Sequence, residues 1–276
     1  MADLTRTALI QLCAASDVGA NLHCAENLIN SAAAAGASVI ALPEAFAFIG
    51  PDAEKRRILE PLDDPAAQTP ILDWCRMMAR QHQIDLIVGG FHEASEDPAR
   101  SYNTCLHINP QGDLAARYRK IHLFDVELAD GTVLRESSKT LPGEVLSTTD
   151  LAFGTLGLSI CYDLRFPYLY QRLVDLGASV LIVPSAFTAT TGAAHWHTLL
   201  RARAIETQCY VLAPAQHGQH NDQRRSYGHS LIIDPWGEVI AELAEGDGFV
   251  IADIDPLLVT EIREQLPSLK HRRAIE

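Results

Sequence analysis

The sequence predicts a mixed α/β fold assembled from strand-helix-strand units. Short apolar runs of strand length alternate with longer stretches in which apolar residues recur at helical spacing. Residues 177–187 nearly repeat residues 36–46, which indicates that one structural unit occurs twice. Turn sequences at residues 109–113 and 234–237 each separate two apolar segments and predict hairpins, so antiparallel strands accompany the parallel ones.

Length, charge and cysteine usage restrict the function. The 276 residues, 47% of them hydrophobic, suffice for a sizeable core, and without a linker-like stretch they predict one domain over residues 1–276. The formal net charge of -13 argues against nucleic acid and anionic membranes as partners and favours small solutes. No apolar run approaches the roughly 18 residues of a membrane span, and the first residues lack a secretory signal. Six scattered cysteines without CxxC pairs fit reduced thiols, so we expect a cytoplasmic protein.

The first half of the chain contains a strand-helix-strand unit, a second helix and strand, and then a hairpin. The apolar patterns predict, in order, a strand over 7–14, a helix over 21–35, a strand over 39–42, a helix over 70–83, a strand over 85–89 and hairpin strands over 102–108 and 114–118. Gly36 ends the first helix, and a right-handed crossover makes the strands that flank it parallel. Glu44 then lies at the carboxyl end of a strand, and Lys120 directly follows the hairpin.

The second half repeats this organisation after a long polar loop over residues 124–144. The predicted elements are a strand over 156–160, a helix over 168–176 ended by Gly177, a strand over 179–183, a helix over 193–208, a strand over 209–215, hairpin strands over 229–233 and 238–243, a strand over 249–254 and a helix over 257–265. The basic residues 270–273 are expected to be a solvated terminus or a subunit contact.

Cys161 ends an apolar run and begins a polar turn. Most free cysteines are small core hydrophobes, but the residues that follow this one, Tyr162 to Arg165, belong at the edge of a cleft. Phe166 and Pro167 resemble the first turn of a helix, so the thiol lies at a strand-to-helix junction. Helix N-terminal amides lower the pKa of a nearby thiol, and we therefore expect Cys161 to be a nucleophile.

Three motifs in this order resemble the nitrilase superfamily of carbon-nitrogen hydrolases. They are Leu-Pro-Glu-Ala at 42–45, Tyr-Arg-Lys-Ile-His at 118–122 and Ile-Cys-Tyr-Asp-Leu-Arg-Phe-Pro at 160–167. Within the superfamily, residues 194–196, 200–211 and 226–230 are similar to the deaminated glutathione amidase branch. The resemblance implies a four-layer α-β-β-α sandwich with two central mixed sheets, which associates into homodimers or larger homo-oligomers.

The resemblance also assigns the catalytic residues. Amide hydrolysis needs a nucleophile, a base, an oxyanion stabiliser and a proton for the leaving amine. Cys161 matches the nucleophile that forms a thioester, Glu44 the base, and Lys120 the cation that stabilises the oxyanion together with the backbone N–H of Tyr162. Glu136 lies sixteen residues beyond Lys120 and matches a second glutamate that holds the lysine, although a lone glutamate in a polar loop is more often merely solvated.

The expected substrate is a small amide that carries a carboxylate. By resemblance, Arg165 and Thr191 bind the carboxylate of a 2-oxo acid, and Phe187 lines the pocket with Tyr162. A buried ion pair between Arg165 and Asp163, or between Arg165 and a glutamate, is an equally reasonable interpretation of that arginine.

The resemblance favours hydrolysis of deaminated glutathione to 2-oxoglutarate and cysteinylglycine. The alternatives are an ω-amidase that releases ammonia from 2-oxoglutaramate, a nitrile hydrolase, and a catalytically idle binding protein, which the complete residue set disfavours. Histidines offer a competing metal site at His195 and His197, or at His217, His220 and His229. Their flanks lack a recognised zinc spacing, so no metal and no cofactor is expected.

Overall fold

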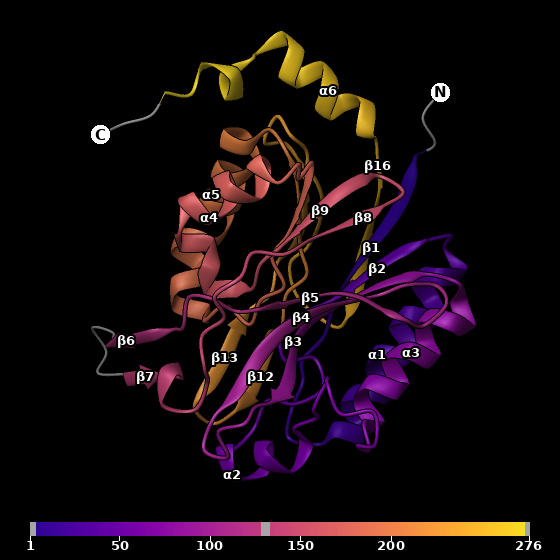
Figure 1. The fold of residues 1–276 in the computed structure, drawn as a ribbon, viewed down its shortest axis with the longest axis vertical. Coiled ribbons are helices and arrows are strands. Elements are labelled where there is room, and N and C mark those ends of the chain that lie inside the picture. The colour runs from indigo at the N-terminus through magenta and orange to yellow at the C-terminus, as the bar shows by residue number, and fades with distance from the viewer. Residues whose placement is uncertain (1–3, 128–132, 274–276) are drawn as a thin grey trace.

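The computed structural model describes residues 4–127 and 133–273 and contains two six-stranded mixed sheets that lie face to face (Figure 1). Their strand orders are β16-β1-β2-β3-β4-β5 and β15-β14-β11-β10-β9-β8. The first sheet consists of β1 (Thr5–Gln11), β2 (Val39–Leu42), β3 (Asp85–Ala94), β4 (Ser101–Ile108), β5 (Leu114–Arg119) and β16 (Gly248–Ile254). The second consists of β8 (Thr148–Leu151), β9 (Gly154–Leu158), β10 (Val180–Ile182), β11 (Tyr210–Ala213), β14 (Ser230–Ile233) and β15 (Val239–Leu243).

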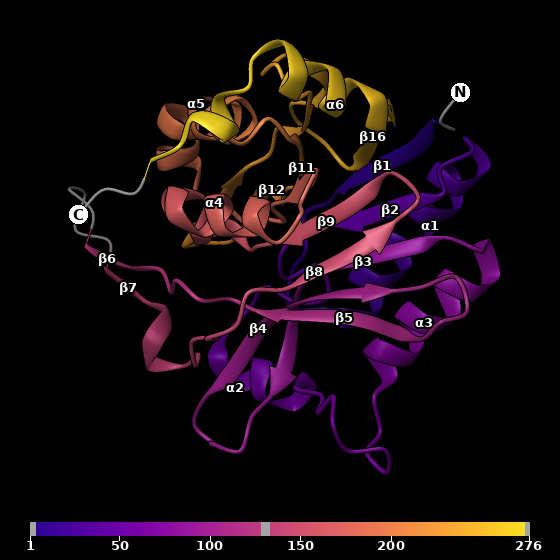
Figure 2. The ribbon, with the colours of Figure 1, turned by 45° about the horizontal axis from the view of Figure 1, so that its top comes forward.

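Helices cover the outer face of each sheet, as Figure 2 shows from a second angle. The helices are α1 (Val18–Ala34), α2 (Asp52–Lys55), α3 (Pro70–His82), α4 (Pro167–Asp175), α5 (Ala189–Thr207) and α6 (Pro256–Gln265). The Asp17 side chain accepts a hydrogen bond from Ala20 N at the start of α1, and Gly36 follows its end with a φ of 88°. Prolines at the first positions of α3 and α4 give both helices a preset backbone angle.

The two sheets have the same internal arrangement. Strands β1, β2 and β3 are parallel, as are β9, β10 and β11, and two antiparallel strands follow in each case. One further antiparallel strand completes each sheet: β16, from the end of the chain, in the first sheet, and β8, which forms a hairpin with β9, in the second. The repeated sequence lies on β2 and β10, which occupy equivalent positions, so the predicted pair of related units is confirmed.

Side-chain alternation along the strands produces the four layers. In the first sheet, Leu9, Ala41 and Ile87 belong to the core that lies between the sheets and extends to α4 and α5. Their neighbours Ile10 and Ile40 belong instead to a second core beneath α1 and α3. Both faces of each central strand are therefore buried, and the predicted α-β-β-α sandwich is confirmed.

Several short elements were not predicted. The expected loop over 124–144 contains β6 (Asp125–Glu127), β7 (Val133–Arg135) and the 3₁₀ helix η2 (Glu136–Ser138), while residues 128–132 lie outside the described part. The sequence also did not predict helix α2 or the hairpin formed by β12 (His217–Asn221) and β13 (Arg224–Tyr227). Their residues are mostly exposed and polar and carry little apolar periodicity. Helix α5 begins at residue 189, four residues earlier than expected.

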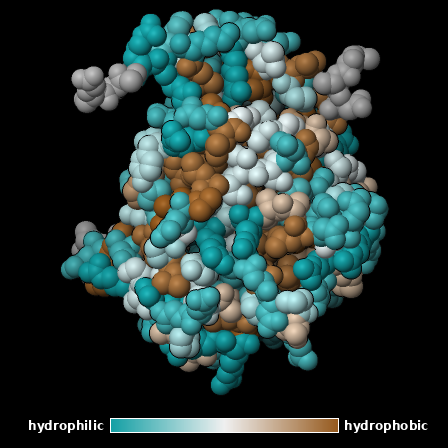
Figure 3. Space-filling view, viewed as in Figure 1, coloured by the Kyte–Doolittle hydropathy of each residue, from teal (hydrophilic) through white to brown (hydrophobic). Residues whose placement is uncertain are grey.

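The surface seen in Figure 3 is mixed, with apolar patches among predominantly hydrophilic residues. Among the helices of residues 4–127 and 133–273, none is long and apolar enough to cross a membrane.

Candidate active site

Glu44 lies two residues beyond the end of β2, in a turn whose next residue, Ala45, has a φ of 57°. Its side chain is nearly buried, with 5% of the residue's surface exposed. The carboxylate accepts hydrogen bonds from Asn103 Nδ2 at 2.9 Å, Lys120 Nζ at 3.1 Å and the backbone N–H of Ala186 at 2.8 Å. A glutamate held by three donors is fixed in place and favours its ionised form.

A glycine of β3 makes room for this turn. The register of β3 against β4 shifts between Val88 and Phe91, and Gly90 in this bulge has a φ of 60°. A Cβ atom on Gly90 would lie 2.4 Å from Ala45 N and 2.7 Å from Glu44 Cγ. Neither contact is tolerable, so the glycine permits the close approach of the Glu44 backbone.

Replacing Gly90 by alanine is therefore expected to destabilise the protein by about 2–4 kcal/mol and to lower its activity, because the new methyl group displaces Glu44. Urea unfolding and kcat/KM measure the two effects. Gly177→Ala is the matched control: Gly177 has a φ of 97°, but nothing lies within 4 Å of its added Cβ atom. Equal losses in the two variants would show that backbone strain alone, and not contact with Glu44, sets the cost.

Lys120 directly follows β5 and is buried between two carboxylates, with 2% of its surface exposed. Its Nζ donates to Glu44 Oε1 at 3.1 Å and to Glu136 Oε2 at 3.0 Å. Burial alone would lower the pKa of Lys120, but Glu136 and Glu44 outweigh it and raise this pKa. Burial likewise favours neutral Glu44, yet Lys120 and the other hydrogen-bond donors lower its pKa to about 2. Both groups are therefore charged at neutral pH.

Glu136 begins η2, and its carboxylate accepts hydrogen bonds from Lys120 Nζ, as Glu44 does. Its Oε2 accepts the backbone N–H of Phe124 at 2.7 Å, and its Oε1 lies 3.3 Å from Asn103 Nδ2. Asn103 thus donates to both glutamates and joins them into one network. Nothing in the sequence around Asn103 distinguished it from any other polar residue of a strand.

Cys161 follows β9 after two residues and has a φ of 46°, an unfavourable conformation for a side chain of this kind. Its backbone N–H donates to Pro184 O at 3.0 Å, which anchors the turn to the end of β10. The thiol is half-buried, and the Glu44 carboxylate is close enough to raise its pKa. Glu44 and Cys161 come from different sheets, so the site lies where the two sheets meet.

The thiol does not have the lowered pKa that the strand-to-helix junction led us to expect. Burial and the neighbouring Glu44 raise the pKa of Cys161, and Lys120 only partly opposes them. The reason is local: a 3₁₀ turn over Cys161–Arg165 separates the thiol from the start of α4 at Pro167. The dipole of α4 is therefore displaced from the sulfur, which remains protonated beside an ionised glutamate.

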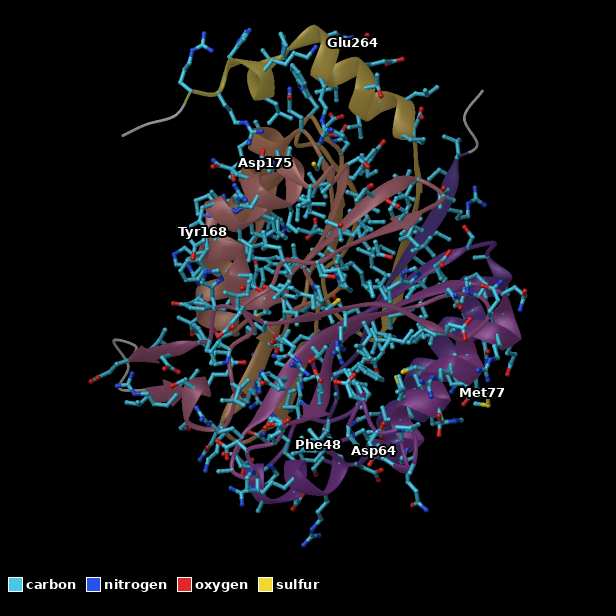
Figure 4. All side chains as sticks on the ribbon, viewed as in Figure 1. Phe48, Asp64, Met77, Tyr168, Asp175 and Glu264 are labelled. Carbon is cyan, nitrogen blue, oxygen red and sulfur yellow. The ribbon has the colours of Figure 1, made fainter. Side chains whose placement is uncertain are left out.

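Asp163 holds the turn that carries the thiol, and it was not predicted. This fully buried carboxylate accepts the backbone N–H of Ile160 at 2.9 Å and the Tyr118 hydroxyl at 2.7 Å. It also hydrogen-bonds to His122 Nδ1 at 2.7 Å, and the other nitrogen of this imidazole contacts the Tyr168 hydroxyl on α4 (Figure 4). The network connects the Lys120 strand to the Cys161 turn and fixes their relative position.

The Asp163 carboxylate binds Tyr118 and His122, and Arg165 has no carboxylate partner among the described residues. Its guanidinium lies 3.3 Å from His195 Nδ1 and 5.2 Å from the centre of the Phe187 ring. The alternative of an ion pair with Asp163 or a glutamate is therefore wrong. A half-buried, unpaired guanidinium is a suitable partner for an anionic ligand.

Two of the other proposed binding residues, Tyr162 and Phe187, have their rings within 6 Å of the Arg165 guanidinium, at 5.9 Å and 5.2 Å. The centres of the Tyr162 and Phe124 rings lie 4.9 Å apart. The backbone N–H of Tyr162 is in the first turn of a 3₁₀ helix, where backbone N–H groups have no hydrogen-bond acceptor within the helix. Phe187 is buried. Thr191 lies in the first turn of α5 and shares a 2.6 Å hydrogen bond with Thr188, so it is helical and not part of a loop.

The histidines form hydrogen-bonded groups. In the described part of the chain, His197, His229 and Glu242 are the one set of three potential ligands whose ligand atoms all lie within 4.8 Å of each other. Both imidazoles hydrogen-bond to the same Glu242 oxygen, at 3.0 Å and 2.6 Å, which accounts for their proximity. His217 pairs with Asp247, and His220 with Ser226.

A thiol beside a Glu-Lys-Glu cluster at the junction of two sheets in an α-β-β-α sandwich defines the class of the nitrilase superfamily. The chain belongs to the carbon-nitrogen hydrolase family, whose pattern matches residues 6–264. The family resemblance of the three motifs is thus confirmed.

Similar proteins and solved structures agree with this family assignment. A protein of Synechocystis sp. named deaminated glutathione amidase is 44% identical over 268 residues, which cover 96% of this chain and 97% of that protein. A protein of Bos taurus with the same name is 45% identical, over 98% of this chain and 83% of its own. Saccharomyces cerevisiae Nit3, described as a member of branch 10 of the nitrilase superfamily, has a TM-score of 0.86 at 32% identity and covers 98% of this chain and 97% of its own. The Caenorhabditis elegans NitFhit protein has a TM-score of 0.92 at 42% identity over 99% of this chain, which spans 66% of that longer protein.

Proposed function

We propose that this chain is an amidase that hydrolyses deaminated glutathione to 2-oxoglutarate and cysteinylglycine. The observation that carries the proposal is the position of Glu44, which accepts a hydrogen bond from Lys120 and lies close enough to the Cys161 thiol to raise its pKa. The names of its full-length relatives, at 44% and 45% identity, support the substrate. The unpaired Arg165 supports an acyl group that carries a carboxylate.

In the first half-reaction, Cys161 attacks the amide carbonyl while its proton passes to Glu44. The transfer moves one negative charge from the carboxylate to the sulfur, and Lys120 stabilises either location because it is close to both. The developing oxyanion is stabilised by the Lys120 ammonium and the Tyr162 N–H. The C–N bond then breaks, Glu44 gives its proton to the departing amine, and a thioester remains on Cys161.

In the second half-reaction, Glu44 removes a proton from water, and the resulting hydroxide attacks the thioester. The C–S bond breaks, the acid product leaves, and the Glu44 proton returns to the Cys161 sulfur. Glu136 and Asn103 hold Lys120 and Glu44 in place throughout, since Glu136 accepts a hydrogen bond from Lys120 and Asn103 donates to both Glu44 and Glu136. No step uses a metal or a cofactor.

The test compares kcat/KM for deaminated glutathione, 2-oxoglutaramate and simple aliphatic nitriles. We expect the highest value for deaminated glutathione. A higher value for 2-oxoglutaramate would make the protein an ω-amidase, and a preference for nitriles would make it a nitrile hydrolase. Absence of turnover with all three classes would favour a binding protein without catalysis.

Replacing Arg165 by glutamine is expected to lower kcat/KM for 2-oxo acid amides about a hundredfold, mainly through KM, because the variant loses a charged contact with the acyl carboxylate. Arg172→Gln on α4, whose side chain is 68% exposed, is the matched control and leaves kcat/KM unchanged. A linear amide without the carboxylate separates binding from misfolding, since its hydrolysis depends little on Arg165. Equal losses with both kinds of substrate would contradict the assignment.

We further propose that the enzyme acts in the cytoplasm as a homodimer or larger homo-oligomer. The family resemblance supports the assembly, and the six free cysteines suit a reducing compartment. Light scattering of the purified protein measures the subunit number, and a monomeric mass at micromolar concentration would refute the assembly.

A further inference from the structure

The proposed mechanism determines where the leaving group lies. Glu44 protonates the amine nitrogen as the C–N bond breaks, so that half of the substrate passes beside the Glu44 carboxylate. The acyl half extends instead toward Arg165, beyond Cys161. Charged side chains near Glu44 that the chemical steps do not use therefore border the leaving group. This inference rests on the proposed function.

Two such side chains, Lys55 at the end of α2 and Arg224 at the start of β13, come from elements remote in sequence. The charge of Arg224 lowers the pKa of Glu44, so its guanidinium lies within electrostatic range of the carboxylate. Lys55 is close enough to Glu136 and Arg224 for both to change its pKa. In the described part of the chain, no carboxylate lies within 4.0 Å of either cation.

Arg224 is exposed at the start of β13 and lies on the same face of the strand as Ser226. Ser226, two residues later on the same face, is 3% exposed, hydrogen-bonds to His220 and forms a bridge with Thr188 beside Phe187. Side chains two residues apart on a strand share a face, so Arg224 extends from the inward face and Arg225 from the opposite one. Asn221 Oδ1 accepts the Arg224 N–H at 3.0 Å and fixes the hairpin turn.

Lys55 is half-buried, and its charge has no partner among the described side chains. Burial lowers the pKa of its ammonium, and no described side chain accepts a hydrogen bond from it. It lines a small hollow with Ser101, which lies on β4 two residues before Asn103 and shares its face. Partial burial of an unpaired ammonium carries a desolvation cost, and an anionic ligand that binds beside it reduces that cost.

We propose that Lys55 and Arg224 bind a carboxylate carried by the leaving amine. The substrate class is then an amide between a 2-oxo dicarboxylic acid and an amino acid or short peptide with a free carboxyl terminus. Arg165 binds one end of such a molecule, and the Lys55-Arg224 pair binds the other. Amides that release ammonia lack the second carboxylate and gain nothing from this pair.

The experiment measures kcat/KM for three substrates: deaminated glutathione, its C-terminal carboxamide and 2-oxoglutaramate. Wild-type protein is expected to prefer the free acid over the carboxamide about tenfold or more. In Arg224→Gln, and separately in Lys55→Gln, this ratio falls toward one. Arg225→Gln, on the other face of β13, keeps the wild-type ratio. Comparing two substrates within each variant cancels any effect of the substitution on Glu44 or on folding.

Product inhibition gives a second readout that does not depend on the rate of chemistry. Cysteinylglycine is expected to inhibit the wild type more strongly than cysteinylglycinamide, and Arg224→Gln removes the difference. Equal kcat/KM for the acid and the carboxamide in the wild type, or an unchanged ratio in both variants, would overturn the inference while leaving the amidase intact. Absence of turnover with deaminated glutathione and 2-oxoglutaramate would overturn the proposed function, and this inference with it.

Discussion

Replacing Cys161 by alanine is expected to lower kcat/KM for deaminated glutathione by about 10⁴-fold or more. The variant retains Glu44, Lys120 and the backbone donors, but it has no atom that can form the thioester. The fold should survive, because alanine occupies less volume and the turn is held through the Cys161 backbone and the Asp163 side chain. The urea midpoint should accordingly remain close to that of the wild type.

The intermediate provides the direct measurement. Mass spectrometry after acid quench is expected to detect a 2-oxoglutaryl adduct on Cys161 of the wild type and none on the variant. Cys24→Ala removes another half-buried thiol, on α1, and serves as the matched control with unchanged turnover. Undiminished hydrolysis by the Cys161 variant would rule out the thiol mechanism, whatever the substrate.

Glu44 and Cys161 could be predicted because each comes shortly after a buried apolar strand, whereas Lys120 was predicted from the resemblance of its motif to the family. Buried strands leave a strong local signal, and Glu44, Lys120 and Cys161 all come within three residues of a strand end. The near repeat of residues 36–46 at 177–187 further placed β2 and β10 in equivalent positions. The structure then brings together side chains that are 76 positions apart in the chain, as Lys120 and Glu44 are.

Asn103 and Asp163 could not be predicted, because their roles depend on contacts made between distant segments. Asn103 meets Glu44 only through the pairing of β4 with β3, whose register shifts at a bulge that the sequence does not reveal. The sequence around Asp163 indicates an exposed polar turn, yet its carboxylate is fully buried and binds Tyr118, on the first sheet, and His122, just after that sheet. The prediction of a lowered pKa for Cys161 was wrong for the same reason, because burial and Glu44, and not the local helix, determine this pKa.

Replacing Lys120 by methionine is expected to reduce both activity and stability. Turnover should fall about 10³-fold, because the oxyanion loses a charged donor and the proton transfer from Cys161 to Glu44 loses its stabilising cation. Stability at neutral pH should fall by about 3 kcal/mol, because the buried Glu44 and the half-buried Glu136 are left without their shared partner. Urea unfolding and kcat/KM measure the two effects, and Lys270→Met, an exposed lysine in the last 3₁₀ turn, is the control.

The pH dependence of the lost stability distinguishes this electrostatic explanation from a packing defect. In the wild type, the pKa of Glu44 is lowered to about 2, so its contribution to stability is present above the unfolded value near 4.5 and is lost as the pH falls toward 2. Without Lys120, burial dominates and raises the pKa of Glu44 above the unfolded value. The ionised Glu44 carboxylate then destabilises the variant as the pH rises above the unfolded value near 4.5. The difference in unfolding free energy between wild type and variant should therefore be larger at pH 7 than at pH 4, whereas the same difference at both would mean that the methionine acts through packing.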